Sequence, residues 1–133
     1  MSPSSPPIPP IPDRVIRVEL GERSYDAIVG TTLIPRVGHL TRIALGEGAA
    51  RAMLVADSAL PPPLVQHASA SMQSQGFAVA TLALEAVEPE KSVRNAERIC
   101  VAMASARLER RDPVIARGGG IIGELAGFAA SMY

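Results

Sequence analysis

Cysteine, lysine and aromatic residues are all scarce in this sequence of 133 residues. A single cysteine, Cys100, excludes an internal disulfide and a zinc site built on cysteines, and this usage is typical of the reducing cytoplasm. Two Phe, two Tyr and no Trp leave little to stack on bases, and 13 basic residues balance 13 acidic ones. We therefore expect a cytoplasmic protein without a nucleic-acid partner.

Long hydrophobic runs and signal-peptide patterns are also missing. The closing apolar run from Ile121 is too short to cross a bilayer and carries Glu124. His39 and His67 stand alone, without the spacing of metal ligands. Residues 1–13 are rich in proline and predict an extended, disordered arm. We expect no membrane contact and no metal site within this sequence.

Strand-like and helix-like patterns alternate along the rest of the chain. The runs VIRVEL and SYDAIVG flank Gly21 to Arg23 and predict an antiparallel hairpin. Apolar periodicity and the positions of Gly and Pro then predict helices over 33–44, 64–75 and 92–108, and strands over 52–57, 77–84 and 113–116. This order indicates an α/β fold over 14–133, Rossmann-like and doubly wound, with a mostly parallel sheet that opens with the hairpin.

The helix predicted over 92–108 is amphipathic. Ser92 is its expected N-cap, and Arg94, Asn95, Arg98 and Arg107 surround an apolar stripe. The members of that stripe are Val93, Ala96, Ile99, Cys100, Met103 and Ala106.

Three segments with unusual chemistry follow predicted strands. They are Asp57, the segment after Leu84, and Gly118 to Glu124. Ligands of doubly wound proteins bind at the carboxyl ends of the strands, so these segments form the candidate site. Asp57 could accept hydrogen bonds from a ribose diol, or it could close an Asx turn or cap a helix.

The segment from Gly118 to Gly123 satisfies G-x-G-x-x-G between a strand and a helix. Such glycines let the backbone approach a pyrophosphate, and the helix N-terminus supplies N–H groups. A tight turn with close packing of the strand against the helix explains the same glycines. Both interpretations stay open from the residues alone.

Three acids and a lysine lie between the second parallel strand and the next helix, in the segment Glu85 to Ser92. Lys91 is the only lysine of the chain, beside twelve arginines. The pattern favours a compact ammonium group at this position, although a solvated, acid-rich helix start would look the same.

Together, E-x-x-K-S and VIARGGGIIGELAGFAA resemble the amino-terminal domain of the 3-dehydroquinate synthase family, within the sugar-phosphate cyclases. The resemblance extends from about Val15 to Tyr133. It implies a lyase of the shikimate pathway, in aromatic amino acid biosynthesis, that uses NAD and a divalent metal, zinc or cobalt. The substrate would be 3-deoxy-arabino-heptulosonate 7-phosphate, and the products 3-dehydroquinate and phosphate. The family is usually a homodimer.

Carried onto this sequence, the resemblance implies a set of cofactor-binding residues. Asp57, Glu88 and Lys91 match positions that contact NAD, Gly119, Gly120, Ile121, Ile122 and Gly123 match the loop around its pyrophosphate, and Glu124 matches an Asp of the family. Three positions depart from the pattern. Val87 replaces a glycine and would be strained at positive φ, Arg117 replaces an aliphatic residue on a strand, and Glu124 is one methylene longer than Asp.

The resemblance also implies that the metal ligands, one Glu and two His, lie in a helical carboxyl-terminal domain that this sequence lacks. We therefore expect an NAD-binding fragment, truncated at its C-terminal end, without catalytic residues and inactive alone. Two alternatives stay open. One is another sugar-phosphate cyclase or a metal-dependent polyol dehydrogenase, and the other is a decayed binding module.

Overall fold

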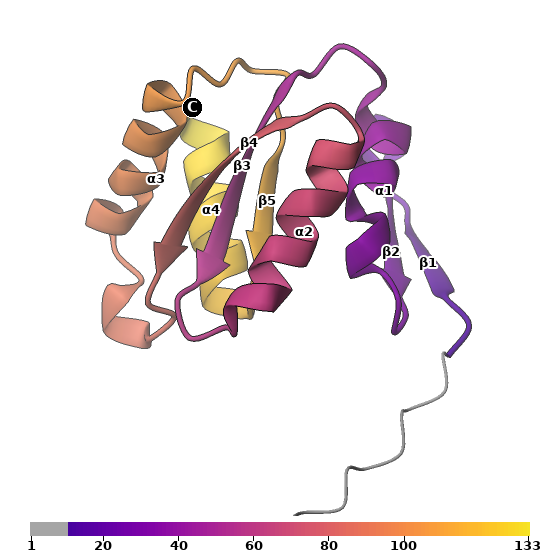
Figure 1. Ribbon diagram of the computed structural model, residues 1–133, viewed down its shortest axis with the longest axis horizontal. Helices are drawn as coiled ribbons and strands as arrows, with labels where there is room; N and C mark the ends of the chain where they lie inside the picture. The colour runs from indigo at the N-terminus through magenta and orange to yellow at the C-terminus, as the bar shows by residue number, and fades with distance from the viewer. Residues whose placement is uncertain (1–10) are drawn as a thin grey trace, which may run out of the picture. The chain divides into compact units, whose positions relative to one another are not determined.

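The computed structural model describes residues 11–133, which form two compact units that divide between Leu33 and Ile34. Residues 1–10, most of the predicted proline-rich arm, lie outside the described residues. The first unit is the predicted hairpin, and the second holds the alternating strands and helices (Figure 1). Among the described residues, no helix is long and apolar enough to cross a membrane.

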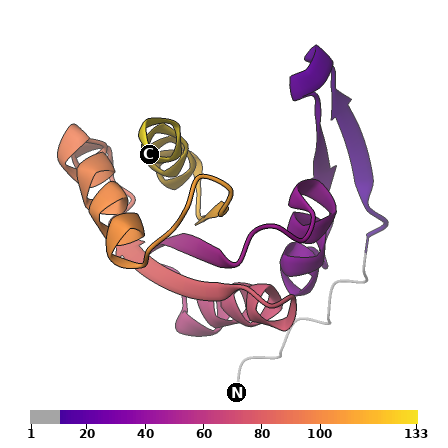
Figure 2. The same cartoon turned by 90° about the horizontal axis from the view of Figure 1, so that it is seen from above.

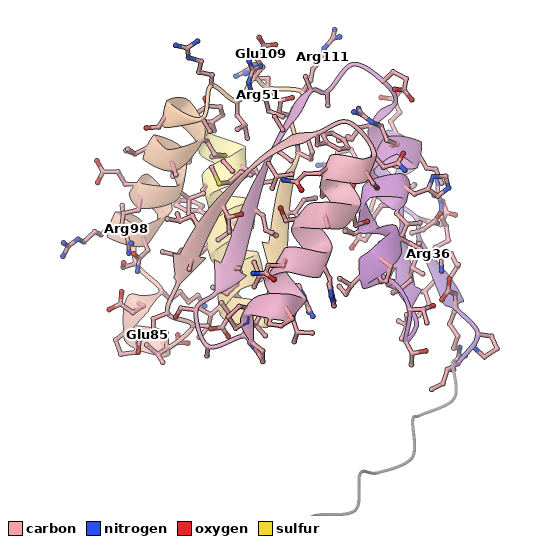
Figure 3. The ribbon with its side chains drawn as sticks, in the orientation of Figure 1. Arg36, Arg51, Glu85, Arg98, Glu109 and Arg111 are labelled. Atoms are coloured by element: carbon pink, nitrogen blue, oxygen red, sulfur yellow. The ribbon has the colours of Figure 1, made fainter. Side chains whose placement is uncertain are left out.

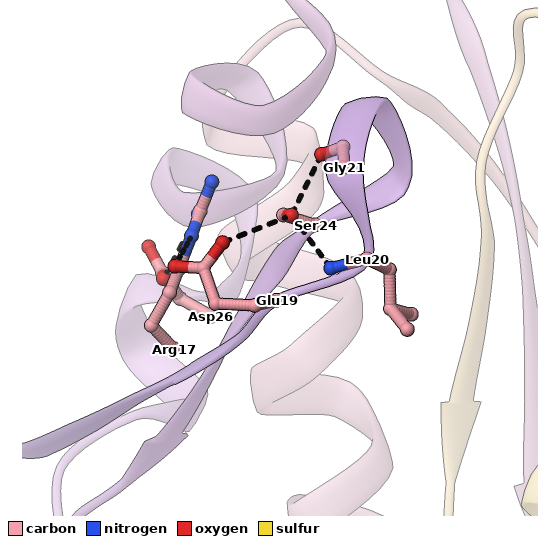
Figure 4. Close-up of polar contacts among 6 residues, drawn as sticks. All are labelled: Arg17, Glu19, Leu20, Gly21, Ser24 and Asp26. Atoms are coloured by element: carbon pink, nitrogen blue, oxygen red, sulfur yellow. Dashed lines mark hydrogen bonds and ion pairs between the residues drawn. The ribbon is translucent and has the colours of Figure 1, made fainter.

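The hairpin consists of β1 (Arg14–Val18) and β2 (Tyr25–Val29), paired antiparallel in a sheet of their own. A 3-10 turn at Gly21–Arg23 joins them, and Gly21 has φ +64°, which a glycine adopts without strain. The Ser24 hydroxyl accepts from Leu20 N at 2.8 Å and donates to Gly21 O at 2.7 Å (Figure 4). The predicted turn is therefore confirmed.

The second unit is a three-stranded parallel sheet with helices on both faces, which confirms the predicted α/β fold class. Its strand order is β4-β3-β5. The strands are β3 (Arg51–Asp57), β4 (Ala78–Leu84) and β5 (Val114–Arg117); the helices are α1 (Val37–Leu45), α2 (Pro62–Ser74), α3 (Val93–Ser105) and α4 (Gly120–Met132).

Alternate residues of the central strand face two separate apolar clusters. Met53 and Val55 pack with residues of α3 and α4, whereas Ala52 packs with Met72 of α2 and with Phe77. Figure 2 shows α3 and α4 on one side of the sheet and α2 on the other. All of β3 from Ala52 to Ala56 is buried, as its unbroken apolar run predicts for a strand covered on both faces.

Helices α1 and α2 cross closely at Gly38. The Gly38 N–H donates to the buried hydroxyl of Ser71 at 3.0 Å, and that hydroxyl donates to Pro35 O at 2.9 Å. A Cβ on Gly38 would lie 2.1 Å from the Ser71 carbonyl oxygen, so only glycine fits here. Arg42 of α1 adds a second link, because its guanidinium donates to the carbonyl of Gln75, the C-cap of α2, and it also donates to Ala49 O before β3.

Asp112 ties the loop before β5 to the beginning of β3. Its carboxylate accepts from the N–H groups of Ala50 and Arg51, each at 3.0 Å, and from Glu109 N at 2.8 Å. Partial burial favours the neutral carboxyl, but these bonds and the Arg51 charge together hold the pKa of Asp112 below its ordinary value. The charged carboxylate thus fixes the amino-terminal edge of the sheet, where Arg51, Glu109 and Arg111 lie (Figure 3).

Candidate functional site

The carboxyl ends of the three parallel strands lie together at the opposite edge, where their arrowheads point in Figure 1. Asp57 pairs in register with Leu84, and Ala56 pairs with Arg117. The chain leaves all three strands here, into the turn after Asp57, the segment from Glu85 to Ser92 and the glycine-rich turn. Figure 3 shows Glu85 at this edge. The topology therefore brings the three predicted segments together.

Asp57 closes a turn at the end of β3. Its Oδ1 accepts from Ala59 N at 2.9 Å, which is an Asx turn and one of the roles expected from the sequence. Its Oδ2 has no hydrogen bond to any described residue, so this half-buried carboxylate retains an acceptor for a ligand hydroxyl. The turn and the binding role are compatible.

The glycines of the motif divide into two groups. A Cβ on Gly118 would lie 2.9 Å from the Ile122 side chain and 3.2 Å from Asp57 Cβ, so Gly118 serves close packing of β5 against α4. A Cβ on Gly119, Gly120 or Gly123 would meet no atom of residues 11–133 within 4 Å. These three positions border open space, which a bound phosphate group can enter.

The first turn of α4 begins in this open space. Gly119 is its N-cap residue, and among the described residues this end of the helix has no side-chain cap hydrogen bond. Unpaired N–H groups and the positive end of the helix dipole favour an anion. Ile121 is half-buried and Ile122 fully buried, so they anchor the turn through packing while the backbone faces outward.

Lys91 and Glu124 form an ion pair between the start of α3 and the first half of α4. Lys91 Nζ lies 2.5 Å from Glu124 Oε2, and the side chains are 42% and 58% exposed. The Glu124 carboxylate, first as hydrogen-bond acceptor and then as a charge, together with the Glu88 charge, raises the pKa of Lys91 above its ordinary value. The contribution that this raised pKa makes to stability is present at neutral pH and is lost as the pH rises through it.

A small pocket of about 290 Å³ adjoins this pair. Its lining comes from the start of α3 and one side of α4: Lys91, Ser92, Val93, Glu124, Leu125 and Phe128. Glu88 lies three residues before Lys91, at the beginning of the 3-10 turn Glu88–Glu90, and its side chain is exposed. The site thus combines one ammonium, several carboxylates and an open helix N-terminus.

Two of the three departures from the family pattern now have a structural explanation. Val87 has φ −118° and ψ 151°, an extended conformation that any residue adopts, so the strain expected there is absent. Arg117 remains unfavourable on its strand, because its Nε is buried without a hydrogen-bond partner among the described residues. Glu124 reaches Lys91, as described above.

Two features of α3 differ from the sequence-based expectation. Ser92 does cap the helix, accepting from Asn95 N at 3.3 Å. However, Val93 of the predicted apolar stripe is 76% exposed, and Asn95 of the predicted polar surround is only 3% exposed. The buried Asn95 side chain has hydrogen-bond partners in the preceding turn, which periodicity alone does not reveal.

Among residues 11–133, no three His, Cys, Asp or Glu side chains are grouped so that they could hold a metal ion. The described residues therefore do not fit a metal site.

Comparison with known proteins identifies relatives over most of the chain. The family model described as 3-dehydroquinate synthase N-terminal matches residues 81–133. The chain is 40% identical over 120 residues to the 3-dehydroquinate synthase of Rhizobium rhizogenes, which is 90% of this chain and 31% of that protein. It is 37% identical over 132 residues to the 3-dehydroquinate synthase of Sinorhizobium medicae, which is 99% of this chain and 34% of that protein.

Solved structures share the fold. Two crystal structures of 2-deoxy-scyllo-inosose synthase match 90% of this chain with a TM-score of 0.77 and 20% identity, and one of them is complexed with carbaglucose-6-phosphate, NAD+ and Co2+. The chain covers 33% and 32% of these structures, and about a third of the length of the curated relatives above. These matches relate the chain to the amino-terminal part of the 3-dehydroquinate synthase family.

Proposed function

We propose that this chain is the NAD-binding part of a 3-dehydroquinate synthase, acting in the cytoplasm on a sugar phosphate. The observation that carries the proposal is the glycine-rich turn. Gly119, Gly120 and Gly123 border open space in front of an uncapped helix N-terminus, and the half-buried carboxylate of Asp57 lies next to this turn. This arrangement fits a dinucleotide, with the pyrophosphate at α4 and a ribose at Asp57.

The residues of the chain would hold and orient the cofactor. Backbone N–H groups at the start of α4 would donate to the pyrophosphate, and Asp57 Oδ2 would accept from a ribose hydroxyl. Lys91 would supply positive charge, Glu88 would lie beside it, and Glu124 would hold the ammonium in place. When bound, NAD supplies reversible hydride removal from a carbon that bears a hydroxyl group. We assign no catalytic residue in this chain.

The binding proposal is tested by isothermal calorimetry of the purified chain with NAD. We expect saturable binding that Lys91→Ala weakens about tenfold, because one charge-assisted contact is lost. Arg111→Ala is the matched control, since it removes an exposed cation at the opposite edge of the sheet and should leave the affinity unchanged. No detectable binding by the unmodified chain would contradict the proposal.

Calorimetry also decides between this proposal and a decayed binding module. Arg117 Nε, which has no hydrogen-bond partner within residues 11–133, favours decay, whereas the unstrained backbone at Val87 removes the other reason for it.

The activity of the chain is tested separately. We expect no phosphate release from 3-deoxy-arabino-heptulosonate 7-phosphate by this chain alone with NAD and Co2+, because the described residues form no metal site. Measured turnover would contradict that part of the proposal.

A further inference from the structure

Asn95 is one of two buried polar side chains among the described residues, the other being Ser71. Its amide carries two donors and one acceptor, and burying such a group is costly unless it is hydrogen-bonded. Ser92 already caps α3, so the helix itself does not need the Asn95 side chain. The amide must therefore serve another part of the structure.

The amide of Asn95 binds the residue directly before Lys91. Its Nδ2 donates to the Glu90 carbonyl oxygen at 2.6 Å and to Glu90 Oε2 at 2.8 Å. Its Oδ1 accepts from Arg98 Nη1 at 2.8 Å. An amide between a guanidinium and a carboxylate forms charge-assisted hydrogen bonds at both ends, which are stronger than neutral ones.

Glu90 is also the last residue of the 3-10 turn Glu88–Glu90, which directly precedes Lys91. Glu90 N donates to Val87 O at 2.9 Å, and Lys91 N donates to Glu88 O at 3.1 Å. The Glu90 carbonyl oxygen also accepts a hydrogen bond from the Ser92 hydroxyl at 3.4 Å. Asn95 therefore fixes the backbone immediately before Lys91 from inside the protein.

The ion pair of Lys91 with Glu124 cannot supply this fixation by itself. Both side chains are about half exposed, and such pairs contribute little because two long side chains must be ordered in water. A fixed backbone lowers that entropic cost by restricting where the lysine begins. The direction of the lysine thus depends on the turn, and the turn depends on Asn95.

We propose that Asn95 is a positioning residue, which directs Lys91 across to Glu124 at the edge of the glycine-rich turn. Its importance for cofactor affinity rests on the proposed function above. Its control of the lysine does not, and the two are measured separately.

The position of Lys91 can be followed by NMR. Because it is the only lysine of the chain, labelling lysine with ¹³C at Cε gives a single side-chain signal. Asn95→Leu is the test variant, because leucine has the same branched arrangement of side-chain heavy atoms, suits a buried position and adds no charge. Ser71→Ala is the matched control, because it also removes a buried hydrogen-bonding group, on α2 at the opposite face of the sheet. Glu124→Gln provides the signal of a lysine without its ionised partner.

We expect Asn95→Leu to shift the Lys91 signal toward its position in Glu124→Gln and to lower the Lys91 pKa toward its value in that variant. Ser71→Ala should leave the signal and the pKa unchanged. If Asn95→Leu does not fold, Arg98→Met removes the outer hydrogen bond from an exposed position and should give a smaller shift in the same direction. A Lys91 signal and pKa that match the unmodified chain in the folded variant would overturn the proposal.

Calorimetry with NAD then measures the consequence for binding. Asn95→Leu should raise the dissociation constant about tenfold, as expected when one charge-assisted contact is lost, while Ser71→Ala should not. Absence of NAD binding by the unmodified chain would reject the proposed function, and the lysine signal would still decide the role of Asn95. If the unmodified chain binds NAD and folded Asn95→Leu binds it with the same affinity, Asn95 does not position Lys91 for the cofactor.

Discussion

Single glycines in the G-x-G-x-x-G segment have different physical roles. Gly118 is required because the strand and the helix pack too closely for a Cβ, whereas Gly119, Gly120 and Gly123 leave space for a ligand. The sequence pattern alone allowed both explanations for the whole segment. Distances to neighbouring atoms separate them residue by residue, which no spacing rule could do.

This separation predicts different effects for the same substitution at two positions: a loss of stability at Gly118 and a loss of NAD affinity at Gly120. Gly118→Ala should destabilise the protein by about 1–3 kcal/mol, because its Cβ overlaps Ile122 and Asp57. Gly120→Ala should keep the stability within about 0.5 kcal/mol but weaken NAD binding at least about tenfold, because the methyl group occupies the phosphate space. Urea denaturation and calorimetry on both variants check this. Equal losses of stability would contradict the assignment.

At the scale of elements, the sequence predicts the positions of helices and strands better than it predicts contacts between side chains. Apolar patterns and the positions of Gly and Pro located β3, β4, β5 and the helices α1 to α3 within a few residues, and the glycine motif indicated where α4 begins. The errors have local causes: α2 begins earlier, at Pro62, because proline is tolerated in the first turn, and α3 ends earlier, before Arg107 at φ +58°. The Asn95 contacts and the Lys91 pair escaped prediction because they join separate elements or a turn, and periodicity describes one element at a time.

The crossing of α1 and α2 gives a prediction at this scale. Gly38→Ala should destabilise the protein by about 3 kcal/mol, since its Cβ would overlap the Ser71 backbone, which cannot move without shifting a helix. Gly127→Ala, in the exposed middle of α4, is the matched control and should stabilise by up to about 1 kcal/mol, because alanine has the higher helix propensity. Thermal unfolding of both variants measures the difference. Similar transition temperatures would show that the helices separate without cost.

At the scale of the whole molecule, the two units differ in how they are stabilised. Every buried apolar residue among those described lies between Ala49 and Ala129, and neither hairpin strand contains a buried residue. The candidate site, from Asp57 to Glu124, falls within the same unit. Burial of apolar surface is the main source of folding stability, so the second unit holds the core that its own folding requires.

Residues 34–133, preceded by an initiating methionine, should therefore fold and bind without the hairpin. We expect a cooperative thermal transition within a few degrees of the full chain, about the shift that 1 kcal/mol causes. Removal of residues 120–133 is the contrasting deletion. It takes away Ile122, Leu125, Ala126 and Ala129 of the larger cluster, and should abolish the cooperative transition. Calorimetric scanning of the two truncated chains distinguishes them. Loss of cooperative unfolding in residues 34–133 would mean that the hairpin completes a core that the buried residues alone do not reveal.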